Sequence, residues 1–423
     1  MPLWKVRGGN ELDGCLAVQG CKNAVLPILA ATLLGGGVTR LTNCPNLRDV
    51  DASVEILRCL GCGVMQNRGE ILVNSECFSE NHIPHALMLK MRSSVIFLGA
   101  ILARCGEARI SAPGGCELGS RPIDLHLKAL RSLGAEISQS GGEIRCRAAR
   151  LKGTHINLDF PSVGATENVM LAACAAEGET VLTNAAREPE IVDLQVFLNS
   201  KGASIYGAGS PEIRIEGFHA MPCTEHAILP DRIAAATYLC AAAAAGGDIY
   251  LTRLFPEHLL TVTQALQSMG CSVEAEREAV RLRRHGALHA GPPVVTGPYP
   301  AFPTDAQALV MAASLRAAGT GAFVETVFQN RFRHVPELCR LGADIRVEGR
   351  VAMVGGVSAL EGAPLSATDL RGGAAMILAG LSAEGETTVF DSGHIDRGYD
   401  DLAGCLRQLG ADVDRFDEGA PTE

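Results

Sequence analysis

Residues 130–137, LRSLGAEI, form a short pattern that recurs along the whole chain. Each copy places a leucine four residues before a glycine, and a small residue and then Ile or Val follow the glycine. The other copies are LRCLGCGV, LNSKGASI, LQSMGCSV, LCRLGADI and LRQLGADV. Their glycines are Gly61, Gly134, Gly202, Gly270, Gly342 and Gly410, with spacings of 73, 68, 68, 72 and 68 residues. This spacing predicts six copies of one structural unit.

The glycine of each copy is the expected left-handed residue after a helix, and the Ile or Val that follows it should open a strand. Cys62 occupies the position that Ala fills in four other copies, so the Cys59-x-x-Cys62 spacing is interpreted as packing rather than as a redox or metal motif. The unit that begins at Ser162 predicts a full order of helix, strand, helix, strand, strand. Its first helix is rich in alanine and should be buried, while its second is amphipathic and should lie outside.

Six such units predict an α/β fold of two inside-out α/β globular domains, each built of three similar repeats of ~70 residues, with the active site in the interdomain cleft. The sixth unit stops after residue 417 without a second hairpin strand. Residues 1–19 read as an orphan hairpin that could complete it. The expected domains are therefore 20–228, which carries the Cys116 loop, and 1–19 together with 229–423.

Composition excludes several classes of function. With 37 basic and 47 acidic residues the net charge is −10, and no basic run with interleaved aromatic residues is present, so nucleic acid is not an expected partner. The longest apolar stretches are shorter than the roughly 18 residues of a membrane span. An odd count of 15 cysteines and the lack of an apolar signal core indicate a cytoplasmic protein. No metal, cofactor or obligate protein partner is expected.

Residues 110–125, ISAPGGCELGSRPIDL, place one thiol in a glycine-rich loop. Pro113, Gly114 and Gly115 exclude a helix or regular strand there, so Cys116 should lie on a mobile loop rather than in a core. Free cysteine is commonly a small buried hydrophobe, but this setting argues for a chemical role. Pro122 suits a first helical position, so a helix should begin near Arg121.

The repeats also bring charged residues to matching positions. The first helices should begin near Lys22, Arg92, Gly164, Arg232, Asp305 and Arg371, and the second near Arg48, Arg121, Arg187, Arg253, Arg331 and Arg397. Helix N-termini attract anions, so this recurrence predicts an anion-binding site. For Arg48, Arg187 and Arg253, pairing with carboxylates across the domain interface is the favoured alternative, and Asp305 could also be an N-cap. The histidines 126, 334 and 394 are interpreted as ordinary surface or hydrogen-bonding residues.

Motifs throughout residues 3–416 resemble those of the UDP-N-acetylglucosamine enolpyruvyl transferases. The matching stretches are GCKNAVLPILAATLL, MRSSV, PGGCELGSRPIDLH, PSVGAT, NAAREPEIVDL, PDRIAAATYL, PAFPTDAQA, ETVFQNRFRHVPEL, ATDLRG and HIDRGYDDL. The resemblance implies the two-domain fold and transfer of the carboxyvinyl group of phosphoenolpyruvate to the 3′-hydroxyl of UDP-N-acetylglucosamine, with release of phosphate through a tetrahedral ketal. Departures such as Val25, Glu117 and Gly372-Gly373 spare every residue named below.

The resemblance also implies roles for individual residues. Cys116 would donate a proton to the vinyl carbon and Asp305 would act on the sugar hydroxyl. Lys22, Arg121 and Arg397 would bind phosphoenolpyruvate, with Asn23 contacting the sugar and the intermediate. The remaining substrate-binding positions would be Arg92, Pro122, Ile123, Asp124, Leu125, Ser162, Val163, Gly164, Val327, Arg331, Asp369 and Arg371. Because the sites come from both halves of the chain, domain closure on substrate binding is a further expectation.

Two alternatives accompany this interpretation. One is 5-enolpyruvylshikimate-3-phosphate synthase, which shares the chemistry but lacks the PGGC loop. The other is a catalytically silent relative that binds the nucleotide sugar without turnover. The cysteine at position 116 further implies sensitivity to the epoxide fosfomycin, which alkylates that thiol in the family, whereas aspartate there confers resistance.

Overall fold

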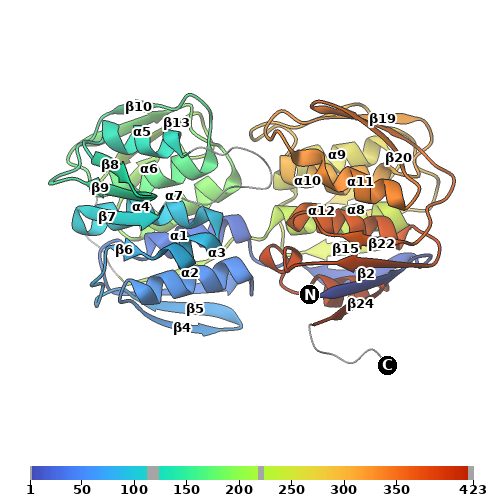
Figure 1. The fold of residues 1–423 in the computed structure, drawn as a ribbon, viewed down its shortest axis with the longest axis horizontal. Helices are drawn as coiled ribbons and strands as arrows, with labels where there is room; N and C mark the ends of the chain where they lie inside the picture. Colours follow the sequence, from blue (N-terminus) through green and yellow to red (C-terminus); the bar gives the residue numbers. More distant parts are fainter. Residues whose placement is uncertain (1, 112–122, 218–222, 418–423) are drawn as a thin grey trace. The chain divides into compact units, whose positions relative to one another are not determined.

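The computed structural model describes residues 2–111, 123–217 and 223–417. These residues form two compact units (Figure 1). We call residues 20–111, 123–217 and 223–229 the middle unit, and residues 2–19 with 230–417 the terminal unit. Each unit is described separately below.

The six repeated glycines all have a positive φ, between 91° and 108°. At Gly134 the preceding helix closes with two hydrogen bonds, from the Gly134 N–H to the carbonyl of Arg131 at 2.9 Å and from the Ala135 N–H to that of Leu130 at 3.1 Å. This pattern is a Schellman C-cap, which requires a left-handed residue and therefore favours glycine. The prediction of a helix stop at each glycine is confirmed. Cys62, in the same motif at Gly61, is a buried free thiol, in agreement with a packing role.

The described residues form six four-stranded sheets that share one strand order. In each, an edge strand pairs in parallel with the strand that follows a core helix, and two further antiparallel strands complete the sheet. The middle unit has β14 (Thr224–Ala227), β3 (Val38–Cys44), β5 (Gly69–Asn74) and β4 (Gly63–Asn67); β6 (His82–Ile83), β7 (Glu107–Ser111), β9 (Glu143–Arg147) and β8 (Glu136–Ser140); and β10 (His155–Asn157), β11 (Glu179–Thr183), β13 (Glu212–Glu216) and β12 (Ser204–Tyr206). The edge strands β14, β6 and β10 of this unit are too short for a periodic signal, so the sequence pattern did not predict them.

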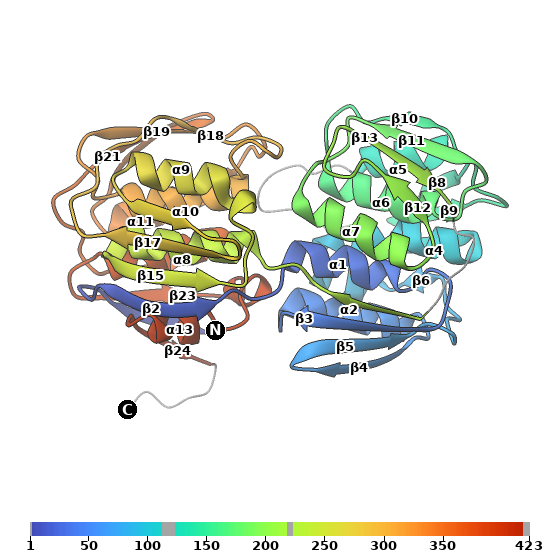
Figure 2. The ribbon, with the colours of Figure 1, turned by 180° about the vertical axis from the view of Figure 1, so that it is seen from behind.

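The sheets of the terminal unit include both N-terminal strands. They are β2 (Leu12–Ala17), β15 (Gly247–Thr252), β17 (Ala279–Arg284) and β16 (Ser272–Ala275); β18 (Val294–Val295), β19 (Thr320–Val324), β21 (Val351–Gly355) and β20 (Asp344–Glu348); and β22 (Pro364–Ser366), β23 (Glu386–Phe390), β1 (Leu3–Arg7) and β24 (Asp412–Phe416) (Figure 2). As expected, β1 supplies the strand that the sixth repeat lacks, between β23 and β24.

The predicted hairpin of residues 1–19 is wrong, because β2 pairs with β15 of the fourth repeat rather than with β1. The chain crosses between the two sheets at Gly8 and Gly9. A Cβ on Gly8 would lie 2.1 Å from the carbonyl oxygen of Ala383, and Gly9 has a φ of +97°. This close backbone passage carries the N-terminal segment from one sheet to the next, so one segment ties together the first and last repeats of the terminal unit.

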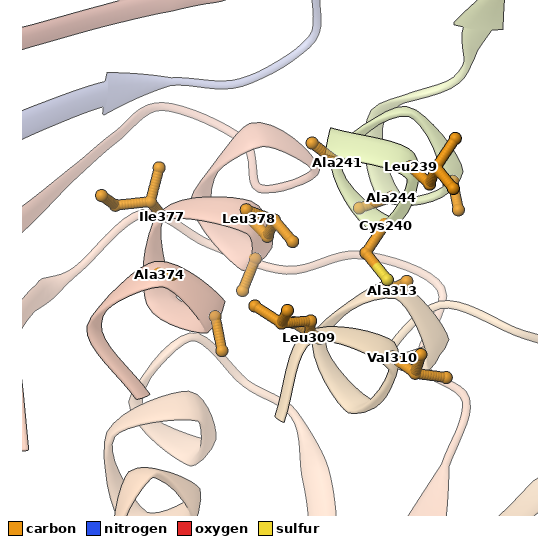
Figure 3. Close-up of a cluster of buried hydrophobic side chains, with 14 of the residues drawn as sticks. Leu239, Cys240, Ala241, Ala244, Leu309, Val310, Ala313, Ala374, Ile377 and Leu378 are labelled. Atoms are coloured by element: carbon orange, nitrogen blue, oxygen red, sulfur yellow. The ribbon is translucent and has the colours of Figure 1, made fainter. Parts of the chain in front are cut away.

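The first helix of each repeat is buried, as expected. In the terminal unit α8 (Arg232–Ala245), α10 (Thr304–Ser314) and α12 (Leu370–Leu381) pack against one another. Figure 3 shows Cys240 of α8, Leu309 of α10 and Leu378 of α12 directed into the same cluster. The corresponding elements of the middle unit are α1 (Lys22–Ala31), η1 (Arg92–Ile96) with α4 (Phe97–Cys105), and α6 (Val163–Ala173). Alanine and glycine on these helices allow close approach of their backbones.

The second helix of each repeat is amphipathic and packs between the core and a sheet. These are α2 (Arg48–Cys59), α5 (Asp124–Ser132) and α7 (Pro189–Ser200) in the middle unit, with a further short α3 (His85–Lys90), and η2 (Pro256–Leu259) with α9 (Leu260–Ser268), η3 (Arg331–His334) with α11 (Val335–Arg340), and η4 (Ile395–Arg397) with α13 (Leu402–Gln408) in the terminal unit. Within the described ranges, no helix is both long and apolar enough to span a bilayer.

Candidate active site

The carboxylate of Asp305 lies between two arginines of the terminal unit. Its Oδ1 accepts a hydrogen bond from Nε of Arg371 at 3.2 Å and lies 3.5 Å from Nη2 of Arg331. Asp305 is the second residue of α10, so its charge also faces the exposed N–H groups of that helix. The N-cap is Pro303, and the alternative of Asp305 as an N-cap is therefore wrong. The side chain keeps 36% of its surface exposed, so a ligand can reach the carboxylate.

Arg331 is fixed by the backbone of α10 as well as by carboxylates. Its Nε and Nη2 donate to the carbonyl of Thr304 at 3.2 and 3.0 Å, and its Nη1 lies 3.9 Å from Oδ1 of Asp369. The side chain is only 4% exposed. A guanidinium held at both ends in this way has little rotational freedom, which suits it to orient a charged partner.

Arg371 lies in the first turn of α12, and Asp369 is the N-cap of that helix. Oδ1 of Asp369 accepts from the N–H groups of Arg371 and Gly372 at 3.0 and 3.1 Å. The Arg371 guanidinium lies over the ring of Tyr399, 5.3 Å from its centroid. The Tyr399 hydroxyl is in turn 2.8 Å from that of Thr237. Four residues proposed from the sequence therefore lie in one connected cluster: Asp305, Arg331, Asp369 and Arg371.

The cluster shifts the ionisation of its members. Burial alone would raise the pKa of Asp305, but Arg371 and Arg331 outweigh it and lower that pKa well below its ordinary range. Burial lowers the pKa of the neighbouring His334 to about 4; Asp369 opposes this shift, and Arg331 adds to it. Asp305 is therefore an ionised acceptor at neutral pH, whereas His334 is neutral.

In the middle unit, Lys22 and Asp49 form a buried ion pair. Nζ of Lys22 lies 2.8 Å from Oδ2 of Asp49, and the two side chains are 9% and 2% exposed. Lys22 is the first residue of α1 and Asp49 the second residue of α2, so the pair joins the starts of two helices. Asn23 follows Lys22 on α1 and is half-buried. The ammonium of Lys22 is thus held at one position rather than left to sample solvent.

A second cluster of the middle unit surrounds the start of α6. Oγ of Ser162 accepts from the N–H of Ala165 at 3.3 Å and caps this helix, and Val163 is its first residue. A Cβ on Gly164 would lie 3.0 Å from Cε1 of His126, so glycine allows the imidazole to pack there. Nδ1 of His126 lies 2.7 Å from Nδ2 of Asn168 and accepts a hydrogen bond from that amide.

Burial lowers the pKa of His126 to about 4; Asp124 opposes this effect and Arg92 reinforces it. Arg92 is the first residue of η1, which packs against α6. Arg92 and the residues 162–164 are thereby brought to one region of the middle unit. A neutral imidazole there leaves the helix N-terminus and Arg92 as the groups suited to an anion.

Other residues predicted for the site lie at the ends of short helices or outside the described residues. Ile123 is the N-cap of α5, and Asp124 and Leu125 open that helix. Arg397 ends η4, whose first turn is capped by the buried carboxylate of Asp391. This short helix packs against α12, the helix that carries Arg371. Cys116, Arg121 and Pro122 lie outside the described residues.

Several residues of these clusters were not predicted from the sequence. His126 and His334 were expected at most to be surface or hydrogen-bonding residues; both are buried, and only the hydrogen bonding was correct. Asp49 carried no signal beyond a first-turn acidic residue. Glu325 directly follows β19, as Asn184 directly follows the equivalent strand β11, so the repeat alignment could have revealed it. Across residues 2–111, 123–217 and 223–417, no group of three or more His, Cys, Asp or Glu side chains is arranged to hold a metal.

Comparison with known proteins places the chain in a family. The family described as EPSP synthase (3-phosphoshikimate 1-carboxyvinyltransferase) matches residues 6–417. UDP-N-acetylglucosamine 1-carboxyvinyltransferase 2 of Caldanaerobacter subterraneus subsp. tengcongensis is 49% identical over 98% of this chain and 100% of its own length. UDP-N-acetylglucosamine 1-carboxyvinyltransferase 1 of Halalkalibacterium halodurans is 47% identical, covering 98% and 94% of the two chains.

Solved structures agree on the fold. The enolpyruvyl transferase NikO from Streptomyces tendae matches with a TM-score of 0.88 at 26% identity over 98% of both chains. EPSP synthase from Acinetobacter baumannii matches with a TM-score of 0.75 at 20% identity over 99% of this chain and 100% of its own, which supports the fold alone. The α/β fold expected from the repeats is confirmed by these matches. The chain belongs to the EPSP synthase family of enolpyruvyl transferases, and within it to the UDP-N-acetylglucosamine 1-carboxyvinyltransferases.

Proposed function

We propose that this protein transfers the enolpyruvyl group of phosphoenolpyruvate to the 3′-hydroxyl of UDP-N-acetylglucosamine and releases phosphate. The observation that carries the proposal is the reachable, ionised carboxylate of Asp305, held by two buried arginines at the start of α10. The names of relatives at 47% and 49% identity supply the acceptor and the transferred carboxyvinyl group. In the cell this would be the first committed step of peptidoglycan precursor synthesis, in the cytoplasm.

The proposed reaction is an addition followed by an elimination. The sugar hydroxyl adds to C2 of phosphoenolpyruvate while Cys116 donates a proton to C3, which gives a tetrahedral ketal. Loss of phosphate, together with return of one C3 proton to the Cys116 thiolate, then restores the vinyl group and the thiol. Asp305 accepts the hydrogen bond of the sugar hydroxyl in this scheme. Because its pKa is strongly lowered, its first role is to orient the hydroxyl, and transfer of the proton to it needs the developing charge of the addition step.

The cationic side chains have separate roles in the proposal. Lys22, Arg121 and Arg397 bind the phosphate and carboxylate groups of phosphoenolpyruvate, with Asn23 on the sugar and the intermediate. Arg92, residues 121–125 and the capped start of α6 at 162–164 bind the diphosphate and uridine. Four further residues have a place beside Asp305 in the proposal. Val327 contacts the sugar, and the charged side chains that support Asp305 are Arg331, Asp369 and Arg371. No cofactor enters the scheme.

Phosphate release from phosphoenolpyruvate tests the proposal, with UDP-N-acetylglucosamine or shikimate 3-phosphate as acceptor. We expect release only with the nucleotide sugar, and its loss in Cys116→Ser. Glu348→Ala, an exposed position on β20, is the matched control and should behave as wild type. Release only with shikimate 3-phosphate would favour the other enzyme that the family description names. Tight binding of the nucleotide sugar without any release would identify a silent relative.

A further inference from the structure

Glu325 is a buried carboxylate for which the proposed reaction has no use. It follows the last residue of β19 and is 1% exposed. Both of its oxygens accept hydrogen bonds: Oε1 from the N–H groups of Val327 and Phe328 at 2.8 and 2.9 Å, and Oε2 from the hydroxyl of Thr304 at 2.8 Å. One side chain thus joins the turn after β19 to the first residue of α10.

Two routes lead from this carboxylate to Arg331. The first runs through Thr304, whose hydroxyl donates to Glu325 and whose carbonyl accepts both Nε and Nη2 of Arg331. The second runs through Phe328, whose N–H donates to Glu325 and whose ring centroid lies 5.9 Å from the Arg331 guanidinium carbon. Arg331 in turn reaches Asp305. Glu325 therefore fixes the support of this arginine from two sides.

The same turn is also anchored through Thr326. Its N–H and hydroxyl bond to Oγ1 and the carbonyl of Thr296 at 2.9 and 2.7 Å. Those bonds hold the turn to residue 296, which precedes α10 by several residues. The bond between Glu325 and Thr304 is the one that ties the turn to the first residue of α10 itself.

We propose that Glu325 is a positioning residue, which sets the Arg331–Asp305 pair and the 326–328 turn in the geometry needed for the sugar hydroxyl. This inference rests on the proposed function for its catalytic consequence. Misplacement of a catalytic group by about 1 Å can cost about 10²-fold in rate, so a side chain that touches no substrate can still control turnover. Glu325 itself takes no proton in the scheme.

Kinetics of variants test the two routes. We expect Glu325→Ala to lower kcat/KM by about 10²-fold. Glu325→Gln should lose only about tenfold, because its amide oxygen can still accept from Val327 and Phe328. Thr304→Val removes the hydroxyl but keeps the branched shape, and it should lose several-fold, whereas Thr304→Ser should restore nearly wild-type kcat. Glu348→Ala, at an exposed position on β20 at the edge of the same sheet, is the control and should match wild type.

A double variant separates positioning from general stability. If Glu325 acts through Arg331, adding Glu325→Gln to Arg331→Met should change kcat/KM by less than about twofold. If the kcat/KM losses of the two single variants multiply fully in the double variant, and all of these variants are folded as judged by circular dichroism, the proposal is overturned. Because Glu325→Ala could fail to fold, the decisive comparisons use the Gln, Val and Ser variants, each of which preserves side-chain volume closely.

Amide hydrogen exchange of the substrate-free protein gives a readout that does not depend on the reaction. We expect the N–H groups of Val327 and Phe328 to lose at least about tenfold protection in Glu325→Ala, or in Glu325→Met if the alanine variant does not fold. Unchanged protection at both amides would overturn the assigned contacts. If wild-type protein releases no phosphate but the amides respond as expected, the proposed function has failed while the structural part of this inference stands.

Discussion

Nε of Arg371 lies 3.2 Å from Oδ1 of Asp305, although 66 residues separate the two in the sequence. The spacing is about that of one repeat, so the contact joins equivalent helix starts of neighbouring repeats, α10 and α12. Arg331 approaches the same oxygen from the outer helix of the fifth repeat. The charged cluster is thus a product of the internal repetition.

Asp305→Asn should abolish most activity and weaken the fold in a pH-dependent manner. We expect kcat/KM to fall by about 10²–10⁴-fold. Because Arg371 and Arg331 lower the pKa of Asp305, its contribution to stability is present above about pH 4 and is lost as the pH falls through the lower, folded-state pKa. At pH 7 the variant should lose about 1–2 kcal/mol, since partial exposure screens the pair. Urea midpoints at pH 7, 5 and 3.5 check this: an equal difference at all three values would contradict it.

Removal of the Lys22 ammonium should lower both stability and activity, and a second substitution should restore stability alone. Lys22→Met leaves the buried Asp49 without the cation 2.8 Å away, and we expect a loss of about 3–5 kcal/mol together with most of the activity. The double variant Lys22→Met/Asp49→Leu should recover part of the melting temperature because it also removes the buried carboxylate. It should not recover phosphate release, since the proposed role of Lys22 is to bind phosphoenolpyruvate. Recovery of activity in the double variant would show that Lys22 is structural.

Two of the eleven histidines should stay neutral far below the usual range. Burial lowers the pKa of His126 and of His334 to about 4, whereas an ordinary imidazole titrates near pH 6.5. The unfolded chain therefore binds more protons between these values, so stability present above about pH 6.5 is lost as the pH falls towards about 4. Each residue could contribute about 3 kcal/mol to this loss.

The NMR titration of imidazole Cε1–H signals measures these two values directly. His126→Gln should also flatten the fall of the urea midpoint between pH 7 and 5, while the exposed His285→Asn should leave it unchanged. A single titration near pH 6.5 for all histidines would contradict the prediction.

Two of the C-cap glycines provide a matched test of backbone and packing costs. Gly342 has a φ of +91° and open space where a Cβ would lie, so Gly342→Ala should cost about 1–2 kcal/mol from the left-handed backbone alone. At Gly61 the Cβ would also lie 2.6 Å from Oγ of Ser79 and 2.7 Å from the carbonyl oxygen of Cys77. Gly61→Ala should therefore lower the melting temperature more than Gly342→Ala does. Equal losses of melting temperature would mean that the segment containing Cys77 and Ser79 moves aside at no cost in free energy.

Fosfomycin should inactivate the wild-type protein through Cys116. We expect a single adduct on that thiol by mass spectrometry of tryptic peptides, and loss of phosphate release in parallel. Cys116→Asp should keep activity in the presence of the drug. A carboxylic acid at this position can still donate the proton, whereas it has no sulfur to form the stable thioether with the epoxide. Turnover that survives saturating fosfomycin without protection by substrate would contradict the assignment of Cys116.

The amino-acid sequence contained the repeat, the helix stops and the strand starts, because a C-cap glycine and the residues around it act within a few positions of one another. All six predicted glycines have the left-handed backbone, and the predicted helix starts at Lys22, Arg232 and Arg371 lie within one residue of the observed ones. The family motifs added the names of the site residues, of which Asp305, Arg331, Asp369 and Arg371 lie in one cluster.

Other features depended on contacts between distant segments. The strand β2 joins the fourth repeat rather than its neighbour β1, and the backbone passes close to residue 383 at Gly8 where it crosses between the two sheets. Asp49 is the partner of Lys22, and Glu325 supports Arg331 from two sides, yet neither residue carries a local pattern that announces it. Pairing between charges and between strands is selected by the packed arrangement of whole helices and sheets, so these relationships became visible only in the tertiary structure.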